Sequence, residues 1–196
     1  DVRVDITEGP RFFEQLVVGR PHDKVPEILC RICAICSAAH MLCSLEAVER
    51  AFGTKITQQT RLLRELLHMG EMLESHSLHL YFLAAPDFTG HQDVVQLAAD
   101  HPKLAQMGLT IKNVANGIQS MLGGGRPIHA CGLTPGGFTF APSEEELVET
   151  KKKLEKILPD AVKTVDTFRS FDHAKFADSE NPFVALEPAG KDYHLH

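Results

Sequence analysis

The stretch RICAICSAAH, at residues 31–40, places two cysteines three positions apart and a histidine four positions after the second. The three residues are Cys33, Cys36 and His40, and mostly small or apolar residues lie between them. Thiolate sulfur and imidazole nitrogen are ligands that nickel, zinc, copper and iron prefer. Because this spacing lets both sulfurs reach one point when the backbone turns, the stretch predicts a site for a soft metal.

The composition is that of a globular protein. The 196 residues are 43% hydrophobic and 23% charged, and the formal net charge is −6. No basic patch stands out, which argues against a nucleic-acid partner. The longest apolar runs fall short of the roughly 18 residues of a membrane span, and no signal-peptide pattern is present. We therefore expect no membrane span and a cytoplasmic location.

Five cysteines are present, and four of them crowd into residues 30–43. An odd, clustered set argues against a secreted disulfide framework and for metal or redox chemistry in a reducing compartment. Outside the motif, Cys30 and Cys43 are interpreted as core or spacer residues, and Cys131 lies in a loop.

Apolar periodicity predicts a mainly helical chain. A strand is expected at 2–7. Ser37 is expected to be the N-cap and Gly53 the C-terminal stop of the third helix, and Ser143 with Glu146 is expected to form a capping box. The predicted helices span residues 11–18, 26–31, 37–52, 57–84, 92–99, 103–122 and 144–168.

Two of these helices are long, and each carries an apolar stripe expected to face the core. In the first, His76 lies on the stripe, and we interpret it as a hydrogen-bonded core histidine in preference to a metal ligand shared with His79. The stripe of the first helix consists of Leu62, Leu66, Met69, Leu73, His76, Leu80 and Leu83. The stripe of the second consists of Leu104, Met107, Ile111, Val114, Ile118 and Met121.

The segment 126–142 is rich in glycine and proline and is predicted to be a long irregular connection, a kind of segment that often carries function. It contains Arg126 and His129. These two residues either line an active-site pocket or fix the loop, and the sequence leaves both interpretations open.

These residues together resemble the N-terminal half of the large subunit of nickel–iron hydrogenases. The stretch 31–40 is similar to the family's first cysteine motif, Arg-x-Cys-Gly-x-Cys-x-x-x-His. Residues 11–14 and 19–20 resemble the stretch that leads into this motif, and residues 124–129 with 136–137 resemble the family's Gly-Gly-(Arg/Lys)…His…Gly-Gly loop. Residues 75–79 with 85–88 resemble the long-helix segment of the cytoplasmic, cofactor-coupled members.

Some features depart from the family pattern. Ala34 replaces the usual glycine of the motif, Ser37 a proline common in cytoplasmic members, and Ala130 the proline after the loop histidine. The family's N-terminal Arg-x-Glu-Gly-His and C-terminal Asp-Pro-Cys-x-x-Cys-x-x-His elements are absent. Residues 1–196 are therefore expected to form the N-terminal part of a large-subunit domain, without half of the metal ligands.

The resemblance implies a fold and an activity. The fold would be mainly α with a small N-terminal β element, a bundle of long helices around a buried metal site. The activity would be heterolytic cleavage or formation of H2 at a nickel–iron centre with carbonyl and cyanide on iron. Cys33 would be a terminal nickel ligand, Cys36 a bridging ligand, and His40 a hydrogen-bond donor to the bridging sulfur.

The resemblance also implies partners. Besides Cys33 and Cys36, only three cysteines remain, whereas an iron–sulfur cluster usually needs four cysteine ligands. Electrons would therefore leave through an iron–sulfur small subunit docked near residues 8–36, and then through a flavin or another acceptor module. Two alternatives are a metal-free relative of the matching respiratory complex I subunit and a small zinc-binding module. The two motif cysteines argue against the first, and the lack of a second Cys-x-x-Cys argues against the second.

Overall fold

The computed structural model describes residue 3 and residues 9–173, and helices dominate this part of the chain. A small antiparallel sheet pairs Leu133 with Phe138. The mainly α prediction is confirmed, whereas the strand expected at 2–7 lies, except for Arg3, outside the described residues. The elements are α1 Pro10–Val17, α2 Val25–Leu29, α3 Ser37–Phe52, α4 Gln58–Leu78, the π-helix η1 His79–Ala84, α5 Ala85–Thr89, α6 Val94–Asp100, α7 Pro102–Leu122, β1 Leu133–Thr134, β2 Gly137–Phe138 and α8 Glu144–Arg169.

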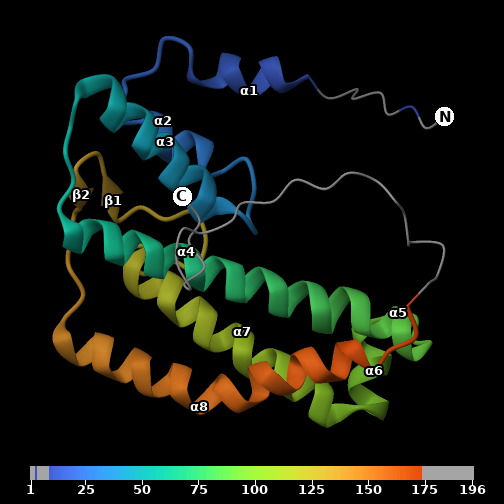
Figure 1. The fold of residues 1–196 in the computed structure, drawn as a ribbon. Coiled ribbons are helices and arrows are strands. Elements are labelled where there is room, and N and C mark those ends of the chain that lie inside the picture. The colour runs from blue at the N-terminus through green and yellow to red at the C-terminus, as the bar shows by residue number, and fades with distance from the viewer. Residues whose placement is uncertain (1–2, 4–8, 174–196) are drawn as a thin grey trace.

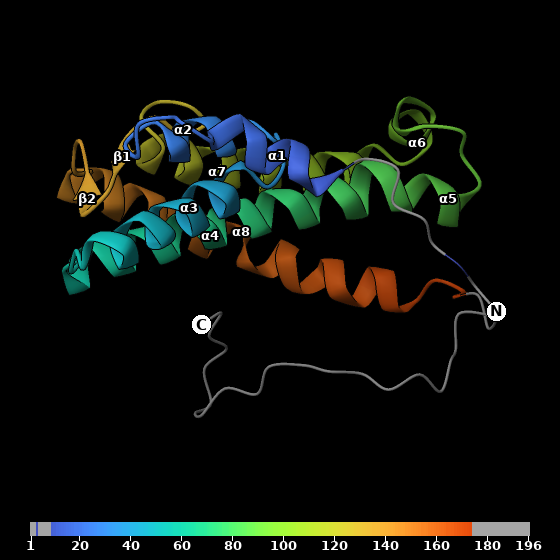
Figure 2. The same ribbon diagram turned by 90° about the horizontal axis from the view of Figure 1, so that it is seen from above.

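Helices α4 and α7 form the centre of the molecule, with α8 along the side away from α1–α3 (Figures 1 and 2). Gly70 of α4 allows the close approach, because a Cβ built there would lie 2.8 Å from Cγ2 of Ile118 on α7. One apolar cluster joins α3, α4, α7 and β1 around Leu45, Leu67 and Leu122. A second cluster joins η1, α7 and α8 around Tyr81. Cys30 and Ala38, on either side of the two motif cysteines, belong to the first cluster.

The buried face of α4 differs from the predicted apolar stripe. Leu66, Leu73 and Leu80 are partly buried, but Leu62, Met69 and Leu83 are 53%, 41% and 57% exposed. A neighbouring stripe faces the core instead, and most of its members are polar or small: Arg64, Leu67, Gly70, Glu71, Glu74 and Ser77. Its charged members have partners on α3 and α7, and such partners offset the cost of burying charge. Hydrophobic periodicity alone does not detect this arrangement.

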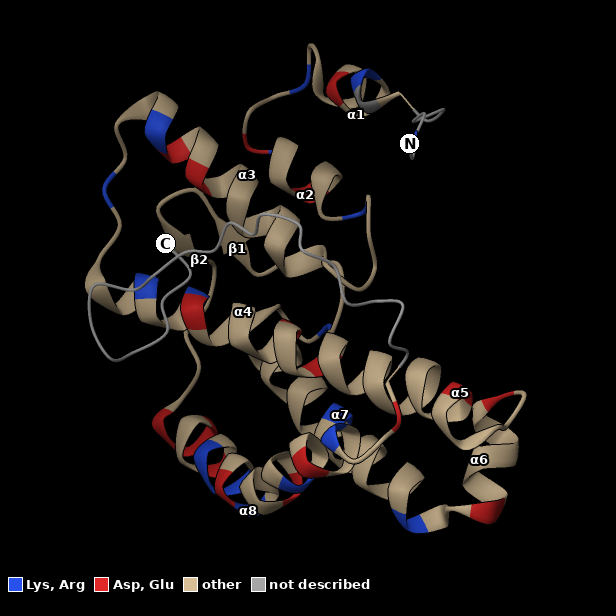
Figure 3. Ribbon diagram, turned by 45° about the vertical axis from the view of Figure 1, so that its right-hand side comes forward, with Lys and Arg blue, Asp and Glu red and all other residues tan. Residues whose placement is uncertain are grey.

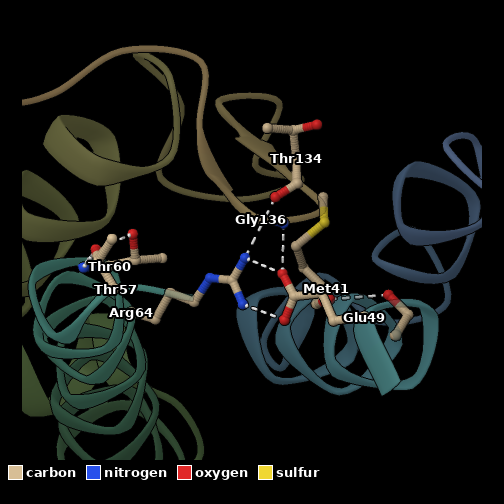
Figure 4. Close-up of polar contacts among 8 residues, drawn as sticks. Met41, Glu49, Thr57, Thr60, Arg64, Thr134 and Gly136 are labelled. Carbon is tan, nitrogen blue, oxygen red and sulfur yellow. Dashed lines mark hydrogen bonds and ion pairs between the residues drawn. The ribbon is translucent and has the colours of Figure 1, made fainter. Parts of the chain in front are cut away.

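A buried ion pair holds α3, α4 and the β hairpin together (Figure 4). Arg64 donates to both carboxylate oxygens of Glu49, at 2.9 and 2.7 Å, and to the carbonyl oxygen of Thr134 at 3.2 Å. Glu49 also accepts the N–H of Gly136 at 2.7 Å. These bonds fix the end of α3 that lies away from the cysteine motif.

The other helix predictions are mostly confirmed, with local corrections. Helix α3 ends at Gly53 in the left-handed conformation, and α8 begins with the capping box of Ser143 and Glu146. The core interpretation of His76 is wrong, because its side chain is exposed on α4. The long helix does not end before Pro86 but continues through η1 and α5 to Gly90.

The surface of α8 carries Lys and Arg beside Asp and Glu along its length, as a solvent-exposed helix does (Figure 3). Its exposed pairs include Lys153 with Glu149, whose charged atoms lie 3.7 Å apart. None of the helices in the described part of the chain combines the length and apolar character that crossing a membrane requires.

Candidate metal centre

The motif cysteines meet in the turn that joins α2 to α3. The Cα atoms of Cys33 and Cys36 lie 5.4 Å apart, and the two sulfurs are joined as a disulfide. The backbone N–H of Cys36 also donates to the Cys33 sulfur at 3.1 Å. The expectation that the spacing brings both sulfurs to one point is confirmed. As reduced thiolates, the same two atoms can serve as neighbouring ligands of one soft metal.

His40 lies in the first turn of α3, four residues after Cys36. Its backbone N–H donates to the Cys36 carbonyl at 3.2 Å, and its side chain is partly buried. Within the described part of the chain, its imidazole has no hydrogen-bond partner. The predicted bond from this imidazole to a bridging sulfur stays a prediction.

The loop after α7 brings His129 to the motif. His129 has φ of 54°, in the left-handed region, and is the only non-glycine residue with positive φ in the described part of the chain. Its N–H donates to Oγ of Ser37 at 3.1 Å, and its Nδ1 lies 3.1 Å from the Cys30 carbonyl. A carbonyl only accepts, so Nδ1 carries the proton and donates. His129 therefore connects the residues on either side of the cysteine turn.

The Ser37 prediction needs a correction. Ser37 is the first residue of α3, whose N-cap position belongs to Cys36, and the Ser37 hydroxyl accepts from the loop instead of capping the helix. The cap comes from α4, where Glu71 accepts the N–H groups of Ala38 and Ala39. Glu71 was not recognisable from the sequence, because one glutamate in an amphipathic helix carries no signal of a contact 33 residues away.

Arg126 does not join this group. It is exposed, and it forms no hydrogen bond or ion pair with the other described residues. Of the two loop candidates, the structure places only His129 against the cysteine motif. A role for either residue in lining an active-site pocket stays a prediction.

The remaining cysteines differ in their surroundings. Cys30 is completely buried, and burial raises the pKa of its thiol above the ordinary value. This agrees with its interpretation as a core residue. Cys43 and Cys131 are exposed and free.

The donor set fits part of a soft-metal site. Two thiolates at one point suit nickel, iron or zinc, but a structural zinc site needs four ligands. Within residues 9–173, the His, Cys, Asp and Glu side chains form no group of three or more that could hold a metal. Cys33 and Cys36 are thus suited to provide two ligands of a centre completed by other residues.

A profile of the nickel-dependent hydrogenase family matches residues 11–115, a range that includes the cysteine motif and most of α7. The chain is 45% identical to the alpha chain of sulfhydrogenase 2 from Pyrococcus furiosus over 170 residues, or 87% of this chain and 41% of that protein. It is 37% identical to a subunit of the F420-non-reducing hydrogenase vhu from Methanococcus voltae, over 95% of this chain and 46% of that protein.

The fold is similar to a chain of an NAD+-reducing [NiFe]-hydrogenase solved in the H2-reduced state. The TM-score is 0.76 at 29% identity, and the similarity covers 80% of this chain and 36% of that one. The present chain spans less than half the length of the curated relatives described above.

Proposed function

The chain belongs to the nickel-dependent hydrogenase family, and from this premise we propose that it forms the N-terminal part of a catalytic nickel–iron hydrogenase large subunit. The proposed activity is reversible, heterolytic cleavage of H2 into protons and electrons. The observation that carries the proposal is the meeting of the Cys33 and Cys36 sulfurs at the start of α3.

Each residue of the motif has a proposed role. Cys33 and Cys36 would hold the nickel–iron centre, Cys33 as a terminal nickel ligand and Cys36 as a bridging ligand, and other residues would supply the remaining two thiolates. When bound, the nickel–iron pair, with carbonyl and cyanide on iron, supplies a redox-active site for H2. In this proposal the Cys33 sulfur would accept a proton, and the His40 imidazole would donate a hydrogen bond to the Cys36 sulfur.

The loop residues have a supporting role in this proposal. His129 binds Ser37 and the Cys30 carbonyl, so it holds the backbone on both sides of the cysteine turn. Arg126 lies exposed on the same loop, and we propose it as a second residue of this loop that lines the active-site pocket.

The proposal includes partner subunits. With two of the five cysteines assigned to the nickel–iron centre, the sequence lacks four cysteines for an iron–sulfur cluster. Electrons therefore pass to an iron–sulfur small subunit whose interface includes residues 8–36, and then to a flavin or another acceptor module. The complex is cytoplasmic in this proposal. A large subunit purified alone that reduces an artificial dye with H2 at full rate would contradict the need for a partner.

Elemental analysis tests the metal assignment directly. The purified complex is expected to contain one nickel per large subunit, and Cys33→Ser should remove it. Cys43→Ser is the matched control, because Cys43 is exposed and lies outside the paired motif. Zinc without nickel in the parent protein would favour a zinc-binding module. Absence of both metals would favour the metal-free relative, and full nickel in the Cys33→Ser protein would contradict the assigned ligand.

A further inference from the structure

The start of α3 is held by a side chain that comes from another helix. Glu71 of α4 receives the backbone N–H of Ala38 on one carboxylate oxygen and that of Ala39 on the other, the second at 2.8 Å. The first residues of a helix leave N–H groups without intrahelical partners, and Cys36 at the N-cap provides no side-chain bond to them. Glu71 therefore replaces a local cap at the point where the cysteine turn becomes a helix.

Glu71 is itself held in a fixed place. It is 4% exposed, and the neighbouring Gly70 packs against Ile118 of α7. One turn along α4, Glu74 forms an ion pair with Lys112, which also belongs to α7. The packing of α4 on α7 therefore fixes the Glu71 carboxylate, and the carboxylate in turn fixes Ala38 and Ala39, two and three residues after Cys36.

The carboxylate also changes the electrostatics at the motif. A helix N-terminus carries partial positive charge and stabilises a nearby thiolate. Burial, and to a smaller extent the neighbouring Glu74, raise the pKa of Glu71 above the ordinary carboxyl value, and the N–H groups of Ala38 and Ala39 offset this only in part by stabilising the charged form. Both oxygens of Glu71 accept N–H groups, which fits an ionised carboxylate that offsets the partial charge of the helix. The electron density on a sulfur at this helix end is then higher than it would be without Glu71.

We propose that Glu71 is a positioning residue of the metal centre: it fixes the Cys36 end of α3, and its charge lowers the redox potential of the centre. This inference rests on the function proposed above. Glu71 acts through its hydrogen bonds with Ala38 and Ala39 and forms none with either proposed ligand.

The test uses the complete purified complex with Glu71→Gln, Glu71→Ala and, as a control, Glu46→Gln. Glu46 lies on α3, and Glu46→Gln also removes one negative charge, but from an exposed side chain. Nickel content is measured by elemental analysis, and the midpoint potential of the centre by infrared-monitored redox titration. Circular dichroism and copurification of the small subunit report folding and assembly.

We expect Glu71→Ala to lower nickel occupancy, because two N–H groups lose their acceptor. Glu71→Gln should keep nickel, since its amide oxygen still accepts, but with a midpoint potential more positive than that of the parent. Glu46→Gln should change neither quantity. Loss of nickel from a folded Glu71→Gln complex would also support positioning, because both carboxylate oxygens would then be required.

Several outcomes would overturn the inference. A Glu71→Gln complex with normal nickel and the parent potential would make Glu71 a simple helix cap, and so would full nickel at an unchanged potential in Glu71→Ala. If neither variant folds, Glu71 is a requirement of the fold and not a positioning residue of the centre. A parent complex without nickel would refute the proposed function itself, whatever the variants show.

Discussion

Arg64 and Glu49 form a two-point ion pair between α4 and α3, with nitrogen–oxygen distances of 2.9 and 2.7 Å. Both side chains are at least nine-tenths buried. Each has a further backbone partner in the hairpin, the carbonyl of Thr134 for Arg64 and the N–H of Gly136 for Glu49. The pair therefore determines how three elements meet, and the loss of one member leaves a buried charge with few partners.

Arg64→Met should destabilise the protein strongly. Removal of one member of a buried ion pair typically costs about 3–5 kcal/mol, because the other charge stays buried without compensation. Arg50→Met is the matched control, since Arg50 pairs with Glu46 on the surface of α3 and exposed pairs contribute about 0–1 kcal/mol. Urea unfolding of the purified proteins measures both effects. Equal losses in the two variants would show that burial of the Arg64 pair has no energetic importance.

The same pair predicts how stability depends on pH. Burial acts to raise the pKa of Glu49, but hydrogen bonds from Arg64 and the Gly136 N–H, together with the Arg64 charge, lower it below the ordinary carboxyl value. A lowered pKa means that the stabilisation is present above the unfolded-state pKa and is lost as the pH falls through the folded-state pKa.

Glu49→Gln should therefore lose stability at neutral pH and show a weaker decline on acidification than the parent. Unfolding free energies measured from neutral to acidic pH check this prediction. Parallel curves for parent and variant would mean that Glu49 does not contribute to acid sensitivity.

Two glycines in helices should respond oppositely to alanine. A Cβ on Gly70 would lie 2.8 Å from the branched side chain of Ile118, and overpacking of this kind costs about 1–3 kcal/mol. Gly117 is exposed on α7, and a Cβ added there would have nothing within 4 Å, so Gly117→Ala should gain up to about 1 kcal/mol of helix propensity. Thermal unfolding should place Gly117→Ala above the parent and Gly70→Ala below it, and the reverse order would contradict the packing described for α4 and α7.

The sequence was sufficient to predict most helices and the close approach of the two motif sulfurs, because apolar spacing, caps and the Cys-x-x-Cys turn are local features. The stripe of α7 was predicted in part: Ile111 and Ile118 are buried in the core, and the other four predicted residues are partly buried. On α4 the buried face holds Arg64, Glu71 and Glu74, whose partners lie on other helices. Contacts of that kind leave no local pattern, so the burial of these residues was not predictable.

The same limit applies to the candidate site. Cys33 and Cys36 were recognisable from their spacing, but the Glu71 cap and the contact of His129 with Ser37 join residues far apart in the sequence. The short β1–β2 pairing also arises within a segment predicted to be irregular. Two residues per strand are too few to produce a detectable alternation of apolar and polar positions.

His40→Ala tests whether the histidine of the motif acts on the proposed centre. His40 is partly buried in the first turn of α3. It lies four residues after Cys36 and is not one of the two proposed metal ligands. If its imidazole donates to the bridging sulfur, the variant complex should keep most of its nickel but lose about 10–100-fold in H2 oxidation, the usual cost of removing such a partner. His76→Ala is the control, because His76 is exposed on α4 and should change neither property. Nickel analysis measures the metal content, and H2-dependent dye reduction measures the turnover. Unchanged turnover in His40→Ala would show that His40 is only a packing residue of α3.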